Sequence, residues 1–309
     1  MAGILIYSEK SRSAAELVSA AKSLDAAGTV HAVSINDDAL AGDMAARGAH
    51  VHKINESRIR LADAASVAAA VGQTAEKVGA SIVLLSSNRR GKELSGRLAH
   101  VLGAGCLTDV LSLKMNGAIM ECVRNSFGGA ALATQSVVTE RQVIALSPKS
   151  FEPAPEGAGG SIEDTSASAV AAGLKLLESR SAAVDAVDLE AAEIIVAVGL
   201  GVDADDLKVA EKLSAVWGGA LGCSKPVATD RKLLPEDRII GLSGSKCKPG
   251  LALLMGISGQ VQFMVGIREA GRIVSINTDE NANTMRMADY RLVGRIKDIL
   301  PELIRAAGA

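Results

Sequence analysis

Short apolar segments alternate with segments of helical periodicity along this chain, and that alternation restricts the fold more than any other feature. In the first half, strands are expected at residues 3–8 (GILIYS), 30–35 (VHAVSI), 49–54 (AHVHKI) and 81–87 (SIVLLSS), and helices at residues 13–27, 61–79 and 91–102. Strand, helix and strand at this spacing require right-handed crossover connections. The pattern predicts a parallel sheet with helices on both faces.

A connector interrupts the pattern between residues 148 and 188. Three of the chain's seven prolines and the cluster Gly-Ala-Gly-Gly stand in its first part, so the first sheet is expected to stop there. A chain of 309 residues is also long for a single hydrophobic core. We therefore expect two domains, an N-terminal one over residues 1–185 and a C-terminal one over residues 186–309.

The alternation resumes after the connector. A buried strand is expected at residues 193–199 (EIIVAVG), followed by a helix at residues 203–217 that Asp203 is placed to cap. Shorter segments follow before a last helix at residues 295–306, and they read ALGCS, RIIGLSG, LALLMG, RIVSIN and DYRLVG. The predicted fold class is α/β, with two doubly wound parallel-sheet (Rossmann-like) domains.

Charge and hydropathy disfavour nucleic acid and membranes as partners. The formal net charge is −2, so a basic face for nucleic acid or anionic lipid is not expected. No apolar run approaches the roughly 20 residues that a transmembrane helix needs, and the first ten residues lack the features of a signal peptide. We expect a cytoplasmic protein without a transmembrane segment.

Cysteine and histidine spacing gives no sign of a metal site. The cysteines are scattered without a CxxC pair, which is typical of free thiols in a reducing compartment. The histidines are His31, His50, His52 and His100. His50 and His52 alternate along an expected strand, and the simpler interpretation is an exposed strand face, because a metal would need further ligands.

Four turns of small and polar residues punctuate the C-terminal half. They read VGLG at 198–201, GCSK at 222–225, GLSGS at 241–245 and GISGQ at 256–260. Ligands of open parallel sheets bind beyond the carboxyl ends of the strands. In the last turn, Ser258 is expected to cap a helix and leave the amides of Gly259 and Gln260 for a phosphate. One such turn alone is more often a capped helix after a core strand, whereas four at one sheet edge favour a ligand.

The C-terminal half lacks the motifs of several enzyme classes, which limits the reactions it could catalyse. It has no histidine, no Gly-x-Ser-x-Gly elbow and no Walker lysine motif, and VGLGVD lacks the third glycine of the dinucleotide fingerprint. A nicotinamide-dependent dehydrogenase is therefore a poor fit. A phosphate-binding site without an acid or base favours a ligand that supplies the chemistry itself, such as a redox cofactor.

Residues 222–304 resemble the FAD domain of the electron transfer flavoprotein α-subunit. The similarity lies in the order of Ser-Lys, GLSG, GISGQVQ, a strand ending in Ile-Asn-Thr-Asp, Ala-Asp-Tyr and a terminal helix that contains proline. The N-terminal half is similar to the first domain of that family in ILIYSE, RRGKELSGRLAHVLGAGCLTDVLSL and RNSFGGAALATQS.

The resemblance implies an electron carrier rather than an enzyme with its own substrate. It would be one subunit of a heterodimer, would bind FAD, and would pass electrons between dehydrogenases and a membrane or ferredoxin-type acceptor. The β-subunit would pack on the first domain. Ser224, Lys225 and Ser243 would lie near the flavin, and Asn277 near the adenosine. The other implied FAD contacts are Gly241, Leu242, Gly244, Ser258, Gly259, Gln260, Val261, Gln262 and Phe263.

Four positions depart from the family's pattern. Leu200 stands in place of arginine, Leu242 in place of glutamine, Phe263 in place of histidine and Arg295 in place of aspartate. Each change removes a polar or charged contact, so we expect weaker retention of FAD or an altered potential. Two alternatives remain open from these residues. Phe263 could be a core residue, and the chain could be a non-redox subunit that binds adenine nucleotide or serves as a scaffold.

Overall fold

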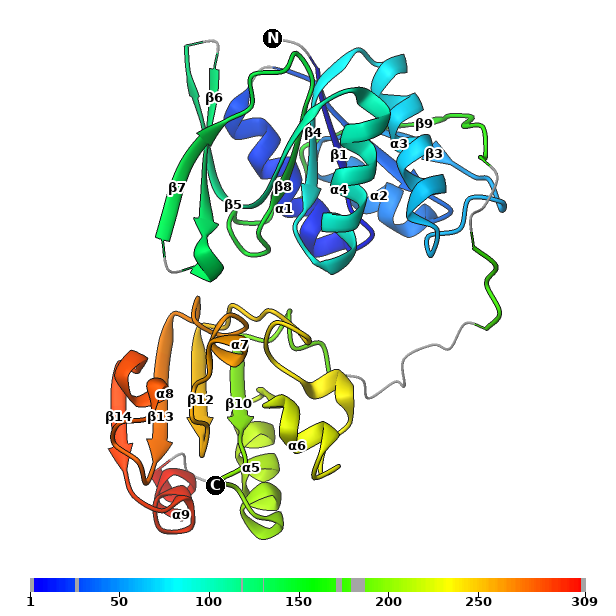
Figure 1. Ribbon diagram of the computed structural model, residues 1–309. Helices are drawn as coiled ribbons and strands as arrows, with labels where there is room; N and C mark the ends of the chain where they lie inside the picture. Colours follow the sequence, from blue (N-terminus) through cyan, green and yellow to red (C-terminus); the bar gives the residue numbers. More distant parts are fainter. Residues whose placement is uncertain are drawn as a thin grey trace. The chain divides into compact units, whose positions relative to one another are not determined.

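The computed structural model describes residues 3–25, 28–117, 119–129, 131–170, 174–178 and 187–306 (Figure 1). The chain divides into two compact units, Met1–Ser179 and Arg180–Ala309. The expected domain boundary, between residues 185 and 186, lies outside the described residues. Among the described residues, no helix has both the length and the apolar character that crossing a bilayer requires.

The first unit is built on one nine-stranded sheet in the order β7-β6-β5-β8-β4-β1-β2-β3-β9. Its strands are β1 (Gly3–Tyr7), β2 (Val30–Ile35), β3 (His50–Ile54), β4 (Ala80–Ser86), β5 (Gly105–Asn116), β6 (Ile119–Ser126), β7 (Ala131–Ser136), β8 (Gln142–Leu146) and β9 (Ser161–Asp164). Its α-helices are α1 (Ser11–Leu24), α2 (Asp38–Ala46), α3 (Ala64–Lys77) and α4 (Arg89–Leu102). The predicted strands and helices are confirmed, and their ends shift by a few residues.

Alternation along the buried strands divides the first unit into two cores. Ile4, Ile6 and Leu84 point to one face, where they pack with residues of α1 and α2. Leu5 and Leu85 point to the other face, where they pack with α3 and α4 (Figure 1). Because both faces are covered, these strands read as continuous apolar runs rather than as alternating ones.

Two parts of this sheet were not expected from the sequence. First, β5 pairs antiparallel with β6, and β6 antiparallel with β7, so the sheet is mixed although β8, β4, β1, β2 and β3 pair in parallel. Second, the connector does not end the sheet, because its segment Ser161–Asp164 pairs in parallel with β3 as β9. A Cβ atom at Gly160 would lie 2.1 Å from the Ala49 carbonyl oxygen, so the glycine is what lets the segment approach.

The second unit contains a five-stranded sheet in the order β11-β10-β12-β13-β14. Its strands are β10 (Ile194–Val198), β11 (Ala220–Cys223), β12 (Leu251–Met255), β13 (Arg272–Asn277) and β14 (Tyr290–Val293), and all of its pairs are parallel. Its α-helices are α5 (Ala204–Val216), α6 (Lys225–Thr229), α7 (Val261–Met264), α8 (Asn283–Met287) and α9 (Ile296–Ala306). The predicted α/β fold class is confirmed.

The two faces of the second sheet are covered differently. Helices α5 and α9 lie side by side on one face, over Val196, Leu253 and Met255 (Figure 1). The other face is covered by α7 and by the segment around Ile240 and Cys247. The segment RIIGLSG, which reads as a strand, forms only isolated bridges at Ile239 and Ile240. Asp203 caps α5 as predicted, accepting from the amides of Asp205 and Asp206 at 3.0 and 2.8 Å.

Candidate functional site

Three of the four small-residue turns meet at the carboxyl edge of the second sheet. The strands that precede them end in register, since Val198 pairs with both Cys223 and Met255. The turns VGLG, GCSK and GISGQ therefore begin side by side, as the sequence predicts. This edge is where ligands of open α/β sheets bind.

The glycines of VGLG and GISGQ are needed first of all for packing between the two turns. The amide of Gly201 donates to the carbonyl of Gly256 at 3.1 Å. A Cβ atom at Gly199 would lie 2.3 Å from the Gly256 carbonyl oxygen, and one at Gly256 would lie 2.8 Å from the Gly201 Cα. Gly256 also has a φ of 61°, in the left-handed region.

The fourth turn, GLSGS, does not end a strand. It is joined to α7 instead, because the amide of Leu242 donates to the Gln262 carbonyl at 2.8 Å. The amide of Ile240 donates to the Cys223 carbonyl at 2.9 Å, which holds the turn beside the end of β11. The side chains of Ser243 and Gln262 are both exposed. The four turns therefore converge, although the fourth does so through α7 rather than through a strand of its own.

The segment from Ser258 to Gln260 differs from the expected capped helix. Ser258 does not cap α7, which begins only at Val261 and spans four residues, with Gln260 in the N-cap position and no side-chain cap. Gly259 has a φ of 80° and is buried against the backbone of Asn283 and Thr284. Within the described part of the chain, the amides of Ser258, Gly259 and Gln260 donate no hydrogen bond to protein.

Three consecutive open amides, of which the middle one belongs to a buried glycine, match an anion. Buried backbone N–H groups are nearly always paired, so the unpaired amide of Gly259 indicates a ligand that accepts a hydrogen bond. Successive N–H groups around a left-handed residue form a concavity of the kind that holds phosphate. The residues present therefore fit the diphosphate of a dinucleotide.

Ser224 and Lys225 lie where β11 passes into α6. Ser224 is half-buried, and its amide donates to the Val198 carbonyl at 3.0 Å, while the Lys225 side chain is exposed at the start of the helix. Burial raises the pKa of the preceding Cys223 thiol to about 11. That thiol is protonated at neutral pH and is not a nucleophile.

Two predicted contacts have local roles in the protein itself. The Asn277 side chain donates to the Ile257 carbonyl at 3.0 Å and accepts from the Asp279 amide at 3.1 Å, so it braces the GISGQ turn. Phe263 is only 6% exposed and packs in the core with Ile195 and Leu254. Its burial supports the interpretation of Phe263 as a core residue.

Sequence reasoning missed one cation at this edge. The Arg231 guanidinium donates to the carbonyls of Leu200 and Val202 at 3.2 and 2.7 Å. It therefore places a positive charge on the turn where Leu200 removes the family's arginine. The motifs gave no signal for it, because the two segments are about thirty positions apart and nothing in DRK indicates a contact with VGLG.

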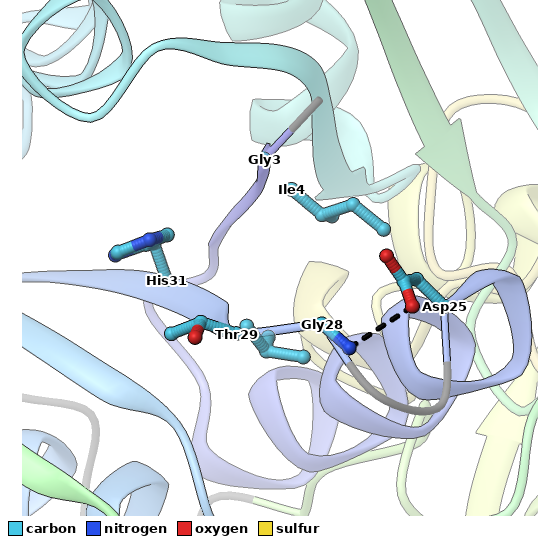
Figure 2. Close-up of a pocket in the computed structure, with 7 residues that line it drawn as sticks. Gly3, Ile4, Asp25, Gly28, Thr29 and His31 are labelled. Atoms are coloured by element: carbon cyan, nitrogen blue, oxygen red, sulfur yellow. Dashed lines mark hydrogen bonds between the residues drawn. The ribbon is translucent and has the colours of Figure 1, made fainter. Parts of the chain in front are cut away.

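A hollow of about 100 Å³ lies in the first unit and contains none of the predicted cofactor contacts. Figure 2 shows it at the beginnings of β1 and β2, with Gly3, Ile4, Thr29 and His31 around it. The Asp25 carboxylate accepts from the Gly28 amide at its rim, at 2.9 Å. It lies at the amino ends of the strands, whereas cofactors of such sheets bind at the carboxyl ends.

Comparison with known proteins decides the family. An electron transfer flavoprotein domain matches residues 7–170, and an electron transfer flavoprotein FAD-binding domain matches residues 188–268. The chain belongs to the electron transfer flavoprotein family. It is similar over 98% of its length to Protein FixB of Escherichia coli O157:H7 and of Shigella flexneri, at 32% identity to each and over 97% of those proteins.

Membership of the electron transfer flavoprotein family settles the class of function. The chain is an α-subunit of this family, an electron carrier whose cofactor is FAD. The family implies a β-subunit as its heterodimer partner. The FAD-binding match covers the strands and turns described above, from β10 through α7.

Proposed function

We propose that the open amides of Ser258, Gly259 and Gln260 hold the FAD diphosphate. The single observation behind this assignment is their lack of any partner within the described residues, although Gly259 is buried. Backbone amides bind phosphate regardless of side-chain identity, so this contact survives the substitutions at neighbouring positions. Val261 and Gln262 continue the same turn along the cofactor.

The flavin end of the site is formed by side chains from the converging turns. Ser224, Lys225 and Ser243 approach it, together with the backbone of Gly241, Leu242 and Gly244. Lys225 is exposed and free to place its ammonium group against an anionic ligand. Asn277 acts at the adenosine end chiefly by holding the GISGQ turn, and Phe263 supports α7 from the core.

Bound FAD supplies the redox chemistry, since the flavin accepts and releases electrons singly or in pairs. The protein sets the energy of the charged forms through the dipoles and charges at the sheet edge. Leu200 and Leu242 are 55% and 67% exposed there, where the family has arginine and glutamine. Loss of one cation and one hydrogen-bonding amide near a flavin that gains negative charge on reduction gives a lower potential and weaker retention.

The carrier serves dehydrogenases as donors and a membrane or ferredoxin-type acceptor. The β-subunit packs on the first unit. Free cysteines at positions 106, 122, 223 and 247 suit a reducing compartment, which supports a cytoplasmic location.

The α-chain purified with its β-subunit provides the test. FAD is removed, then titrated back while flavin absorbance and fluorescence are followed. We expect saturable binding, and we expect Lys225→Gln to weaken it. Lys212→Gln, an exposed lysine on α5, is the matched control.

The exposed Leu200 and Leu242 are the observation that favours the second candidate, a subunit that kept the fold as a nucleotide-binding scaffold. That candidate predicts no flavin bands and binding of adenosine diphosphate as tight as that of FAD. Such a result for the intact heterodimer would refute the assignment of this site to FAD.

A further inference from the structure

Three of the chain's four histidines converge on one face of the first sheet. His50 and His52 lie two positions apart on β3, and the strand register places His31 of β2 opposite His50. His31 Nδ1 and His52 Nε2 are 3.0 Å apart. The ring centroid of His50 lies 5.5 Å from that of His31 and 4.9 Å from that of His52. One ring nitrogen from each lies within 4.8 Å of the others.

The spacing of His50 and His52 predicts an exposed strand face, and this prediction is wrong. His52 is only 2% exposed, and His31 and His50 are half-buried. The remaining inward positions of the same face are filled by Val33, Ile35 and Ile54, which belong to the apolar core. Three imidazoles at the end of this apolar row therefore require an explanation other than packing.

Groups on β9, on the residue after it and at the end of α3 orient the rings. Glu163 Oε2 lies 3.2 Å from His50 Nε2, and Ser161 bonds to His50 Nδ1. Thr165 bonds to His52 Nδ1 at 3.3 Å. The Lys77 ammonium pairs with the other Glu163 oxygen at 2.7 Å. Hydrogen bonds of this kind to the second nitrogen are how proteins hold metal-binding imidazoles in position.

We propose that His31, His50 and His52 form a site for a divalent transition-metal cation that prefers imidazole, with Zn²⁺ as the leading ion. Neutral imidazole suits zinc, copper and nickel, and three protein nitrogens with one open position are an established zinc geometry. Two nitrogens bound to one tetrahedral zinc lie about 3.3 Å apart, given Zn–N bonds of about 2.0–2.1 Å. The 3.0 Å separation of His31 and His52 is close to that spacing.

His50 reaches the same ion by rotating one nitrogen away from β9. Glu163 then remains as its hydrogen-bond acceptor, and a water takes the fourth position.

One histidine of the cluster also borders the hollow in the first unit. His31 lines the hollow of about 100 Å³ at the beginnings of β1 and β2, together with Gly3 and Thr29 (Figure 2). Within the part of the chain that the structure describes, this site is built wholly from the first unit and shares no residue with the proposed FAD contacts. A test of this metal site can therefore succeed or fail independently of the assignment of the FAD contacts.

The test uses the full-length chain, freed of metal with a chelator and titrated with Co²⁺ as a spectroscopic substitute for Zn²⁺. We expect about one equivalent of Co²⁺ to give the visible bands of a four-coordinate nitrogen site, without the near-ultraviolet band of a thiolate ligand, and Zn²⁺ to displace it. Loss of an outer-shell partner costs about 10- to 100-fold in affinity, so Glu163→Gln is expected in that range. His31→Ala and His50→Ala should each cost more than about 100-fold.

His100→Ala is the matched control, since His100 is the remaining histidine and is exposed on α4. It should bind Co²⁺ as the parent does. Should the alanine variants fail to fold, imidazole resonances of the parent chain give the same answer: added Zn²⁺ must shift those of three histidines and leave that of His100. Unchanged binding in His31→Ala and His50→Ala, a thiolate band, or no binding by the parent would overturn the proposal.

Discussion

Replacing Gln260 by proline removes one amide from the proposed diphosphate site and little else. Gln260 has a φ of −57° and a ψ of 149°, which proline adopts without strain. Its amide donates no hydrogen bond within the described residues, and its side chain is exposed. The substitution should therefore leave the free energy of unfolding unchanged or raise it by about 0.4–1 kcal/mol.

The effect on FAD should be much larger. A hydrogen bond to a charged group contributes about 1.5–3 kcal/mol, which corresponds to a weakening of FAD binding by about 10- to 160-fold. Titration of the heterodimer with FAD measures the loss, and urea denaturation of the same sample confirms folding. Gln260→Ala keeps the amide and should bind within about 3-fold of the parent. Equal binding by the two variants would show that this amide does not contact the phosphate.

Three further outcomes are expected. Asp203→Ala should cost about 0.5–2 kcal/mol in urea denaturation, since two amides of α5 lose their acceptor, whereas Asp205→Ala, exposed beside it, should cost less than about 0.5 kcal/mol. Leu200→Arg should tighten FAD binding and raise the flavin potential, because it returns a cation to an exposed position on the VGLG turn. A spectroelectrochemical titration measures the potential, and an unchanged value would argue against a flavin beside that turn. The free energy of unfolding should fall as the pH drops from about 6.5 to 4, because burial lowers the pKa of His52 to about 4 while the unfolded chain takes up that proton near pH 6.5. Denaturation curves should show a loss of up to about 3 kcal/mol. The loss should be smaller in His52→Gln and unchanged in His100→Gln.

Much of the fold follows from patterns that single segments carry. Strands such as Leu251–Met255 are buried on both faces, so their apolar runs between turns are unambiguous. The segment Ser161–Asp164 has no such signal, because it is short, polar and mostly exposed at an edge. Its place in the sheet depends on a distant partner, and Gly160 has a role there only because Ala49 lies opposite.

The site was predictable to the level of its turns but not of its contacts. Parallel strands bring their carboxyl ends together, which is a property of topology, so the convergence at Val198, Cys223 and Met255 could be foreseen. The sequence predicts Ser258 as a helix cap, but Gly259 has a left-handed φ of 80° and the helix begins only at Val261. The bond from Arg231 to the VGLG turn and the meeting of the histidines depend on register between separate segments, which no local pattern encodes.

The mutual packing of Gly199, Gly201 and Gly256 changes what these residues can tell about ancestry. A lineage that gave up its flavin would still be selected for glycine at all three, because any larger residue there would force two backbone segments apart. Retention of the glycines across relatives is thus a record of architecture. Loss of the cofactor would instead be visible at exposed neighbouring positions such as Leu200, where a substitution does not destabilise the fold.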